Sequence, residues 1–337
     1  MGERKKVLLG WFRSGDRIAP YVRRLEEAGL EVVPNPLNRL LNEDELIAAL
    51  PGVFATIASM EPYTDRVFRE AKDLRVIARF GVGYDKVDVE AATRHGVIVA
   101  MAFGCNHEAV ADWTLTLMTG IAGHLPRHHQ RVLEGRWGYD LPRGLWRTTV
   151  GIVGLGRIGK AVARRCRGFD MRILAYDVQR DEAFAREHGV AFVPLETLLR
   201  EADFVTIHAP HSPDTDALIN TARLALMKPT AFLINTARGG LIDEAALYQA
   251  LATRKIAGAA LDVFRTEPLQ PDSPLRRLEN VILTPHMAGL DLGAEGTLAD
   301  RCVQSILAVA QGRSPGAEYV LNPAALASTQ RGPAIAA

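Results

Sequence analysis

Short apolar runs alternate with amphipathic stretches along the first hundred residues. The apolar runs predict buried strands at 7–11, 53–58, 76–80 and 97–100. Between them, apolar residues recur at helical spacing, as in 17–28, 65–72 and 87–95. Because strands that alternate with helices pair in parallel through helical crossovers, this part of the chain predicts a small α/β domain.

The alternation stops between residues 123 and 147, after a predicted apolar helix at 109–121. This stretch contains prolines and glycines together with Trp137, Tyr139 and Trp146. A structureless loop of this length is unusual inside a compact domain, and aromatic side chains are unfavourable in water. Two interpretations remain: the stretch is an arm that covers another surface, such as a second subunit, or it folds back on its own chain.

From residue 149 the alternation resumes with greater regularity. Apolar runs predict strands at 150–153, 172–176, 204–208, 231–235, 259–263 and 281–283. Helical stretches separate most of them, notably 158–167 and 243–253, which indicates a doubly wound parallel sheet. One amphipathic helix follows at about 294–310, and then a tail rich in proline and alanine in which we find no motif.

Composition narrows the class of protein. A chain of 337 residues exceeds what one hydrophobic core usually serves, so we expect two domains. Its net charge of +1 gives no broad electrostatic reason to bind nucleic acid or an anionic membrane. We expect neither a signal peptide nor a membrane span, which needs about 20 apolar residues. Three scattered cysteines argue against disulfides and favour a cytoplasmic location.

A glycine-rich turn joins the first strand of the second region to a helix. It has the pattern G-x-G-x-x-G at Gly154, Gly156 and Gly159. The first glycine allows the tight turn, the second lets the backbone approach a pyrophosphate, and the third lets the helix pack closely. Asp177 ends the next strand, where a carboxylate binds ribose hydroxyls and repels a 2′-phosphate. These features predict a site for NAD rather than NADP, although Arg180 nearby could accommodate a phosphate.

Three later strands are each followed by a residue suited to the reduction of a keto acid. Arg238, Glu267 and His286 stand at or just beyond these strand ends, and ligands of doubly wound sheets bind there. An arginine guanidinium binds a carboxylate with two hydrogen bonds. His286 can donate a proton to a developing alkoxide, while Glu267 would orient the imidazole and favour its protonated form.

At these motifs the chain resembles the NAD-dependent D-isomer-specific 2-hydroxyacid dehydrogenase family, over residues 7–322. The resemblance rests on the motif at 81–88, on the glycine-rich turn and on the three later strand ends. It is greatest toward the branch of phosphoglycerate dehydrogenases. It implies that Arg238 binds the substrate carboxylate, that His286 is the proton donor, and that Glu267 is the partner of His286.

The resemblance also implies further contacts. Backbone groups of Val82 and Gly83 would bind the substrate. Asp262 would lie near the carboxamide of the nicotinamide. The residues implied to contact NAD are Gly154, Gly156, Arg157, Ile158, Gly159, Asp177, Ala209, Thr236, Ala237, Asp262, His286 and Gly289.

The fold implied is a doubly wound parallel (Rossmann) sheet domain inserted into a smaller flavodoxin-like α/β substrate domain. Residues 104–289 would bind NAD, and residues 1–103 with 290–337 would form the substrate domain. Members of the family are typically homodimers, which suits an arm around Trp137.

The substrate itself is less specified. Phosphoglycerate dehydrogenases usually carry an Arg-Ser type phosphate grip in the loop after the strand matched here by 54–58. This chain has Ser59-Met60-Glu61-Pro62-Tyr63 there, and the carboxylate of Glu61 would disfavour a phosphate. Arg13 is either a substitute cation or a solvated loop residue. Hydroxypyruvate or glyoxylate therefore fits the loop at least as well as 3-phosphoglycerate.

Two other functions are compared with the dehydrogenase. An NAD(H)-sensing, corepressor-like binding protein of the same fold would keep the same site residues. A formate dehydrogenase would carry glutamine in place of Glu267, so Glu267 argues against it. We expect no metal site at His124, His128 and His129, because Pro126 would interrupt a helix that brings these side chains together.

Overall fold

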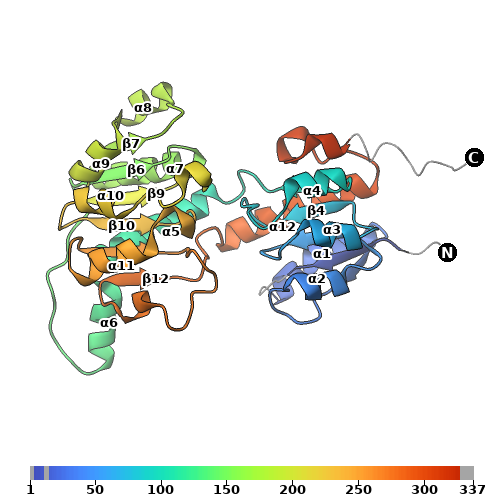
Figure 1. Ribbon diagram of the computed structural model, residues 1–337, viewed down its shortest axis with the longest axis horizontal. Coiled ribbons are helices and arrows are strands. Elements are labelled where there is room, and N and C mark those ends of the chain that lie inside the picture. The colour runs from blue at the N-terminus through green and yellow to red at the C-terminus, as the bar shows by residue number, and fades with distance from the viewer. Residues whose placement is uncertain (1–3, 11–14, 327–337) are drawn as a thin grey trace, which may run out of the picture. The chain divides into compact units, whose positions relative to one another are not determined.

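The chain folds into two units, one of which is inserted between the two segments of the other. The computed structural model describes residues 4–10 and 15–326 (Figure 1). The first unit comprises residues 1–106 with 292–337, and the second comprises residues 107–291. The roles of the two units as substrate domain and NAD domain stay predictions at this point.

The first unit contains a five-stranded parallel sheet. Its strands are β1 (Lys6–Leu9), β2 (Glu31–Val33), β3 (Val53–Ala58), β4 (Val76–Arg79) and β5 (Ile98–Met101). They lie in the order β2-β1-β3-β4-β5, which is the flavodoxin-like order. Successive strand residues face opposite sides, so that Leu8 belongs to one buried cluster and Val7 and Leu9 to the other.

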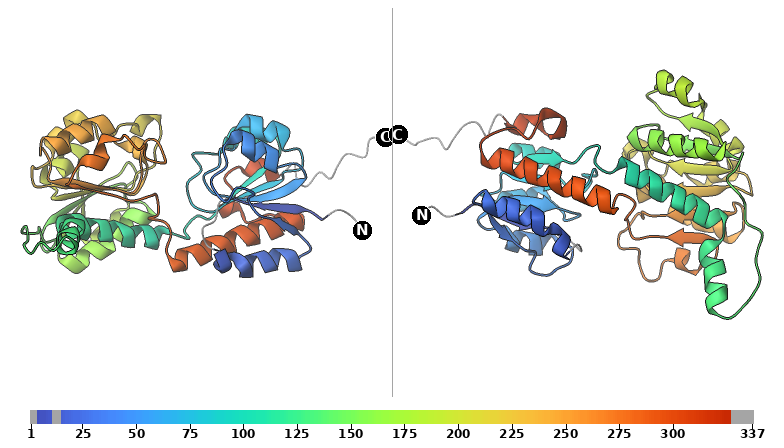
Figure 2. Two further views of the ribbon diagram at one scale, coloured as in Figure 1. Left: turned by 90° about the horizontal axis from the view of Figure 1, so that it is seen from below. Right: turned by 180° about the vertical axis from the view of Figure 1, so that it is seen from behind.

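Helices cover both faces of this sheet. Helices α1 (Ala19–Glu27) and α12 (Leu292–Ala310) lie side by side on one face, as Figure 2 shows. Helices α2 (Glu43–Ala49), α3 (Asp65–Glu70) and α4 (Val89–Arg94) pack on the other. After α12 the chain returns to the edge strand β5, where the buried Asn322 side chain accepts the N–H of Val99 at 2.8 Å. The last described segment thus completes the first unit.

The second unit contains a seven-stranded parallel sheet. Its strands are β6 (Thr149–Val153), β7 (Arg172–Tyr176), β8 (Val190–Phe192), β9 (Phe204–Ile207), β10 (Phe232–Asn235), β11 (Gly258–Leu261) and β12 (Val281–Leu283). Their order is β12-β11-β10-β9-β6-β7-β8, so the direction of winding reverses between β6 and β9. This is the doubly wound arrangement, which confirms the predicted fold class.

Helices also cover both faces of the larger sheet. One face packs against α5 (His107–Ala122), α7 (Arg157–Cys166) and α8 (Glu182–His188). The other packs against α9 (Leu195–Glu201), α10 (Thr221–Leu226) and α11 (Glu244–Ala252). Both clusters consist of apolar side chains that are almost fully buried, so both faces of the sheet are covered by helices.

The stretch 123–147, which we call the arm, differs from the prediction. It contains a helix, α6 (Leu125–Leu133), with Pro126 in its first turn. A proline there sacrifices no helical hydrogen bond, so Pro126 begins the helix and does not interrupt one. Asp140, later in the arm, forms ion pairs with two residues of α6: its carboxylate lies 3.1 Å from Arg127 and 2.9 Å from Arg131.

The arm exposes its apolar side chains. Trp137 is 95% exposed and Leu141 is 82% exposed. Beyond them the chain is anchored again, because Arg143 donates to the buried Asp203 at 2.9 Å and Leu145 is buried. Within this chain Trp137 and Tyr139 are therefore left uncovered, whereas Trp146 donates its indole N–H to Asp170 at 3.3 Å.

Candidate active site

The predicted site residues of the larger unit lie in the turns that follow its strands. Because all seven strands are parallel, these turns share one edge of the sheet. The segment from Gly154 to Gly159 follows β6, Asp177 follows β7, and Ala209 lies beyond β9. The segment from Thr236 to Arg238 follows β10, and Asp262 and Glu267 lie after β11. His286 and Gly289 lie after β12. Val82 and Gly83 follow β4 in the other unit.

His286 and Glu267 are in direct contact. Nδ1 of His286 lies 2.6 Å from Oε2 of Glu267, and the other carboxylate oxygen accepts the N–H of Phe264 at 2.9 Å. The carboxylate is thereby fixed by its own turn before it binds the imidazole. With Nδ1 engaged, Nε2 is the ring nitrogen that can exchange a proton with a substrate.

Charge also favours this pair. Burial raises the pKa of Glu267, whereas the hydrogen bond and positive charge of His286 lower it. The N–H of Phe264 and the charge of Arg238 lower it further, so that the pKa of Glu267 lies below its usual range. Glu267 therefore carries a negative charge at neutral pH.

The turn with Arg238 is shaped by a buried side chain. Asn235, the last residue of β10, accepts the N–H of Ala237 at 3.0 Å and donates its amide to the carbonyl of Arg238 at 2.8 Å. These two bonds bend the chain directly after the strand. The guanidinium of Arg238 donates to the carbonyl of Ala237 at 2.6 Å.

Gly239 allows the turn of Arg238 to meet the turn of Glu267. A Cβ atom at residue 239 would lie 1.9 Å from the carbonyl carbon of Phe264, which is closer than any side chain can approach. Glycine is therefore required here by the contact between two backbones. The contact places the cation of Arg238 close enough to influence Glu267.

His286 adopts an unusual backbone conformation. Its φ angle is +53°, in the left-handed region, which costs a non-glycine residue roughly 1–2 kcal/mol. Its N–H donates to the carbonyl of Asp262 on the neighbouring strand end at 2.8 Å. Asp262 itself is fully buried, and both of its carboxylate oxygens bond to the turn of His286.

The glycine-rich turn fits a dinucleotide. Gly154 has a φ angle of +94°, and a Cβ on Gly159 would lie 2.1 Å from the Gly154 carbonyl oxygen, so the fold itself needs both glycines. Gly156 differs, because its φ angle is −72° and nothing lies within 4 Å of a Cβ built on it. The missing side chain at Gly156 thus serves a purpose outside the protein's own packing, as a close-approaching phosphate would require.

His208, which follows β9, provides a second sign of an absent group. Its Nε2 lies 2.9 Å from the Thr206 hydroxyl, but its buried Nδ1 has no hydrogen-bond partner among the described residues. Burial lowers the pKa of His208 to about 3, so the ring is neutral. A buried polar atom without a partner costs about 1–3 kcal/mol, which a bound group can recover.

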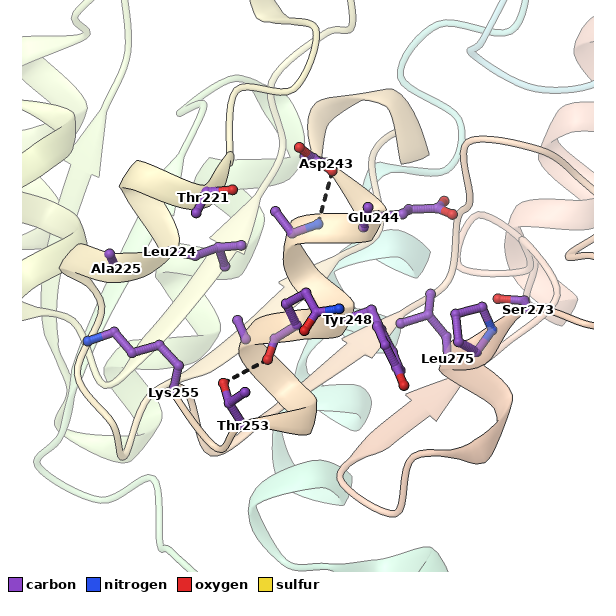
Figure 3. A pocket seen from close by; sticks show the side chains of 15 residues that line it. Thr221, Leu224, Ala225, Asp243, Glu244, Tyr248, Thr253, Lys255, Ser273 and Leu275 are labelled. Atoms are coloured by element: carbon purple, nitrogen blue, oxygen red, sulfur yellow. Dashed lines mark hydrogen bonds between the residues drawn. The ribbon is translucent and has the colours of Figure 1, made fainter.

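A large hollow lies elsewhere on the second unit. Its volume is about 730 Å³, and it is lined mainly by side chains of α10, α11 and residues 273–275. Figure 3 shows these side chains. None of the residues predicted to bind NAD or substrate lines it. It lies on the helices that cover one face of the sheet, whereas the predicted residues lie at the sheet's edge.

His124, His128 and His129 lie in the first part of the arm. His128 bonds through Nε2 to the carbonyl of Asp140 at 3.2 Å. Within residues 4–10 and 15–326, no group of three or more His, Cys, Asp or Glu side chains could hold a metal ion. Among the helices of the same residues, none combines the length and apolarity that crossing a bilayer requires.

Comparison with known proteins gives consistent matches. The family model described as D-isomer specific 2-hydroxyacid dehydrogenase, NAD binding domain, matches residues 115–288. A glyoxylate reductase of Korarchaeum cryptofilum is 43% identical over 311 residues, which are 87% of this chain and 92% of that protein. A D-3-phosphoglycerate dehydrogenase of Archaeoglobus fulgidus is 37% identical over 295 residues, 86% of this chain but only 55% of that protein.

Solved structures agree with the sequence matches. The crystal structure of the TT0316 protein from Thermus thermophilus superposes with a TM-score of 0.85 at 36% identity. The match covers 94% of this chain and 99% of that protein. Both units therefore have counterparts in one solved protein.

Replacing Glu267 with glutamine tests the charge of the His286 pair. Because folding lowers the pKa of Glu267, its ionised form stabilises the protein above the usual glutamate pKa, and this contribution is lost as the pH falls. We expect wild type to exceed Glu267→Gln in free energy of unfolding at pH 7, and the difference to shrink from about pH 4.5 downward. Urea unfolding of both proteins at a series of pH values measures this difference in free energy of unfolding.

Glu187→Gln is the matched control, since Glu187 lies 3.7 Å from His188 but is exposed. It should change stability little at any pH. A difference for Glu267→Gln that stayed constant down to about pH 3 would contradict the lowered pKa.

Proposed function

The chain belongs to the D-isomer-specific 2-hydroxyacid dehydrogenase family, and we propose that it reduces a small unphosphorylated 2-keto acid such as glyoxylate or hydroxypyruvate. As a family member it is an NAD-dependent oxidoreductase that acts on CH–OH donors. Arg238, Glu267 and His286 are the proposed catalytic set. The 2.6 Å contact between Nδ1 of His286 and Oε2 of Glu267 carries the proposal.

Each residue of the set has one task. When bound, NADH supplies the hydride that reduces C2 of the keto acid. The guanidinium of Arg238 binds the substrate carboxylate and orients C2. His286 holds a proton at Nε2 and gives it to the oxygen as the alkoxide develops. Glu267 stays ionised beside Nδ1, and the hydrogen bond between them fixes the orientation of the imidazole.

The loop around Glu61 supports an unphosphorylated substrate. Glu61 is 1% exposed, and its carboxylate accepts the N–H of Ser59 at 2.6 Å. The buried Arg79 nearby donates to the backbone carbonyls of Ala58 and Phe80. In phosphoglycerate dehydrogenases the matched loop usually carries the residues that bind the phosphate. A carboxylate held in this loop would disfavour a phosphate. Arg13, the other cation considered, lies outside the described residues.

Loss of NADH absorbance across glyoxylate, hydroxypyruvate, pyruvate and phosphohydroxypyruvate tests the function. We expect kcat/KM for an unphosphorylated acid to exceed that for phosphohydroxypyruvate about tenfold or more, because Glu61 repels the phosphate. His286→Ala and Arg238→Ala should each lower kcat/KM about 100-fold or more. NADH binding should survive both substitutions.

The outcomes separate the alternatives. Preference for the phosphorylated acid would overturn the substrate assignment and leave the dehydrogenase. Near-wild-type turnover by either variant would remove that residue from the catalytic set. Tight NADH binding without turnover of any keto acid would favour the NAD(H)-sensing, corepressor-like alternative.

We propose further that NADH is preferred over NADPH. Asp177 directly follows β7, and both of its carboxylate oxygens are engaged: one accepts the N–H of Leu155 in the glycine-rich turn at 2.6 Å, and the other accepts the N–H of Gln179 at 2.9 Å. The negative charge is thus fixed beside the turn that would hold the pyrophosphate, where it repels a 2′-phosphate. Arg180 stacks on the ring of Phe192, with 5.5 Å from the guanidinium carbon to the ring centre.

Gly156→Ala tests whether the glycine-rich turn binds the cofactor. The new Cβ meets nothing within 4 Å and φ is ordinary, so the melting temperature should stay close to that of wild type. NADH affinity, measured by fluorescence, should fall about tenfold or more because the methyl group blocks backbone approach. Gly168→Ala, which also meets nothing within 4 Å, is the control and should keep NADH affinity. Equal affinity in both variants would remove the turn from the binding site.

We propose that the protein is a homodimer and that the arm forms part of the interface. The arm's side chains Leu125, Leu133, Trp137, Tyr139 and Leu141 are all exposed in the single chain. A concentration of exposed large apolar side chains in one segment is typical of a protein interface. Cytoplasmic location stays a prediction that the three free thiols suit.

The double substitution Trp137→Ser, Leu141→Ser should shift the protein from dimer toward monomer at micromolar concentration. The removed side chains are nearly fully exposed in the chain, so its melting temperature as a monomer should not depend on them. Light scattering coupled to gel filtration measures the mass. Leu292→Ser, at an exposed leucine outside the arm, is the control. An unchanged dimer would place the interface elsewhere.

A further inference from the structure

The turn that carries His286 is held in a conformation uncommon for its sequence. Strand β12 ends at Leu283, and three residues later φ is +53°. A non-glycine residue adopts this left-handed conformation persistently only where its surroundings fix it. The N–H of His286 donates to the carbonyl oxygens of Asp262 at 2.8 Å and of Thr284 at 3.1 Å. The residue that follows β11, Asp262, therefore helps to set the position of the imidazole.

The side chain of Asp262 bonds to the same turn on both sides of His286. Its Oδ1 accepts the Thr284 hydroxyl at 2.5 Å and the N–H of Met287 at 3.1 Å. Its Oδ2 accepts the N–H of Ala288 at 2.8 Å. Asp262 is 0% exposed, so the carboxylate is enclosed by the turn that it holds.

Helix α5 fixes the direction of these bonds. Nε1 of Trp113 donates to the hydroxyl oxygen of Thr284 at 3.4 Å. Because an indole N–H can only donate, the Thr284 hydroxyl accepts there and gives its own hydrogen to Asp262. The next residue of the helix, Thr114, contacts the hydroxyl of Thr236 in the turn after β10 at 3.0 Å. One helix thus supports two of the turns that hold candidate site residues.

We propose that Trp113, Thr284 and Asp262 form a positioning chain that fixes the imidazole of His286 for proton transfer. Asp262 acts on the imidazole through this turn, in addition to the nicotinamide contact that the family resemblance implies. The inference rests on the proposed function. The contacts require a carboxylate, because every group that bonds to it in the turn is a hydrogen-bond donor. If an asparagine stood there, its NH₂ group would face one of these donors and no hydrogen bond could form.

The test uses Thr284→Val, which keeps the branched shape and removes the hydroxyl. Asp262 then loses one donor and Trp113 loses its acceptor. We expect kcat at saturating NADH and keto acid to fall about tenfold or more, while the Kd for NADH changes by less than about twofold. Thr284→Ser, which retains the hydroxyl, should restore kcat to within about threefold of wild type.

Thr148→Val is the matched control. It removes a hydroxyl that bonds to the carbonyl of Leu145 at 2.7 Å, at the opposite edge of the sheet, and should leave kcat unchanged. A weaker NADH affinity in Thr284→Val with kcat intact would show that the chain of contacts serves cofactor binding alone and would overturn the proposal. An unchanged kcat and Kd would overturn it equally.

A second measurement needs no turnover. The Nδ1 proton of His286, bonded to Glu267, is observed by NMR and identified by its loss in His286→Ala. The proposal predicts that this signal shifts or disappears in Thr284→Val and is retained in Thr284→Ser and Thr148→Val. If wild type reduces none of the keto acids, the proposed function fails while this signal still decides on the positioning chain. A signal unchanged in Thr284→Val overturns the chain.

Discussion

The common direction of the strands is the constraint on which the site depends. A parallel pair cannot be joined by a tight hairpin, so each strand of the larger sheet ends in a turn that leads toward a crossover. These turns share one edge, and β10, β11 and β12 are neighbours in the sheet. Arg238, Glu267 and His286 follow those three strands in turn. Residues far apart in the chain thus become neighbours through strand order alone.

Much of the fold could be predicted because buried strands leave contiguous apolar runs. Strands β3, β7 and β12 have the predicted bounds. The strands β2 and β8 gave no such signal, since each is a three-residue edge strand with one exposed side chain. Helix α6 has no buried residue, because its apolar side chains are exposed, and a proline in the first turn resembles a helix end when only the sequence is seen.

For the candidate site, the sequence indicated the reactive side chains but not the residues that position them. A reactive side chain directly after an apolar run is visible in the sequence, as for Arg238 and His286, and the family resemblance supplied their roles. The groups that position them are not visible in this way. Trp113 and Thr284 are 171 positions apart, and only the packing of α5 against the sheet brings them into contact. Hydrogen bonds across such separations leave no local pattern.

The left-handed backbone of His286 sets the proposed proton transfer against an unstrained backbone. Glycine occupies this conformation without steric cost, and asparagine tolerates it well. If His286 is the proton donor, selection for an unstrained backbone alone would favour residues without an imidazole here, whereas selection for turnover retains histidine. A consensus or stability-guided redesign of this protein should therefore leave residue 286 unchanged.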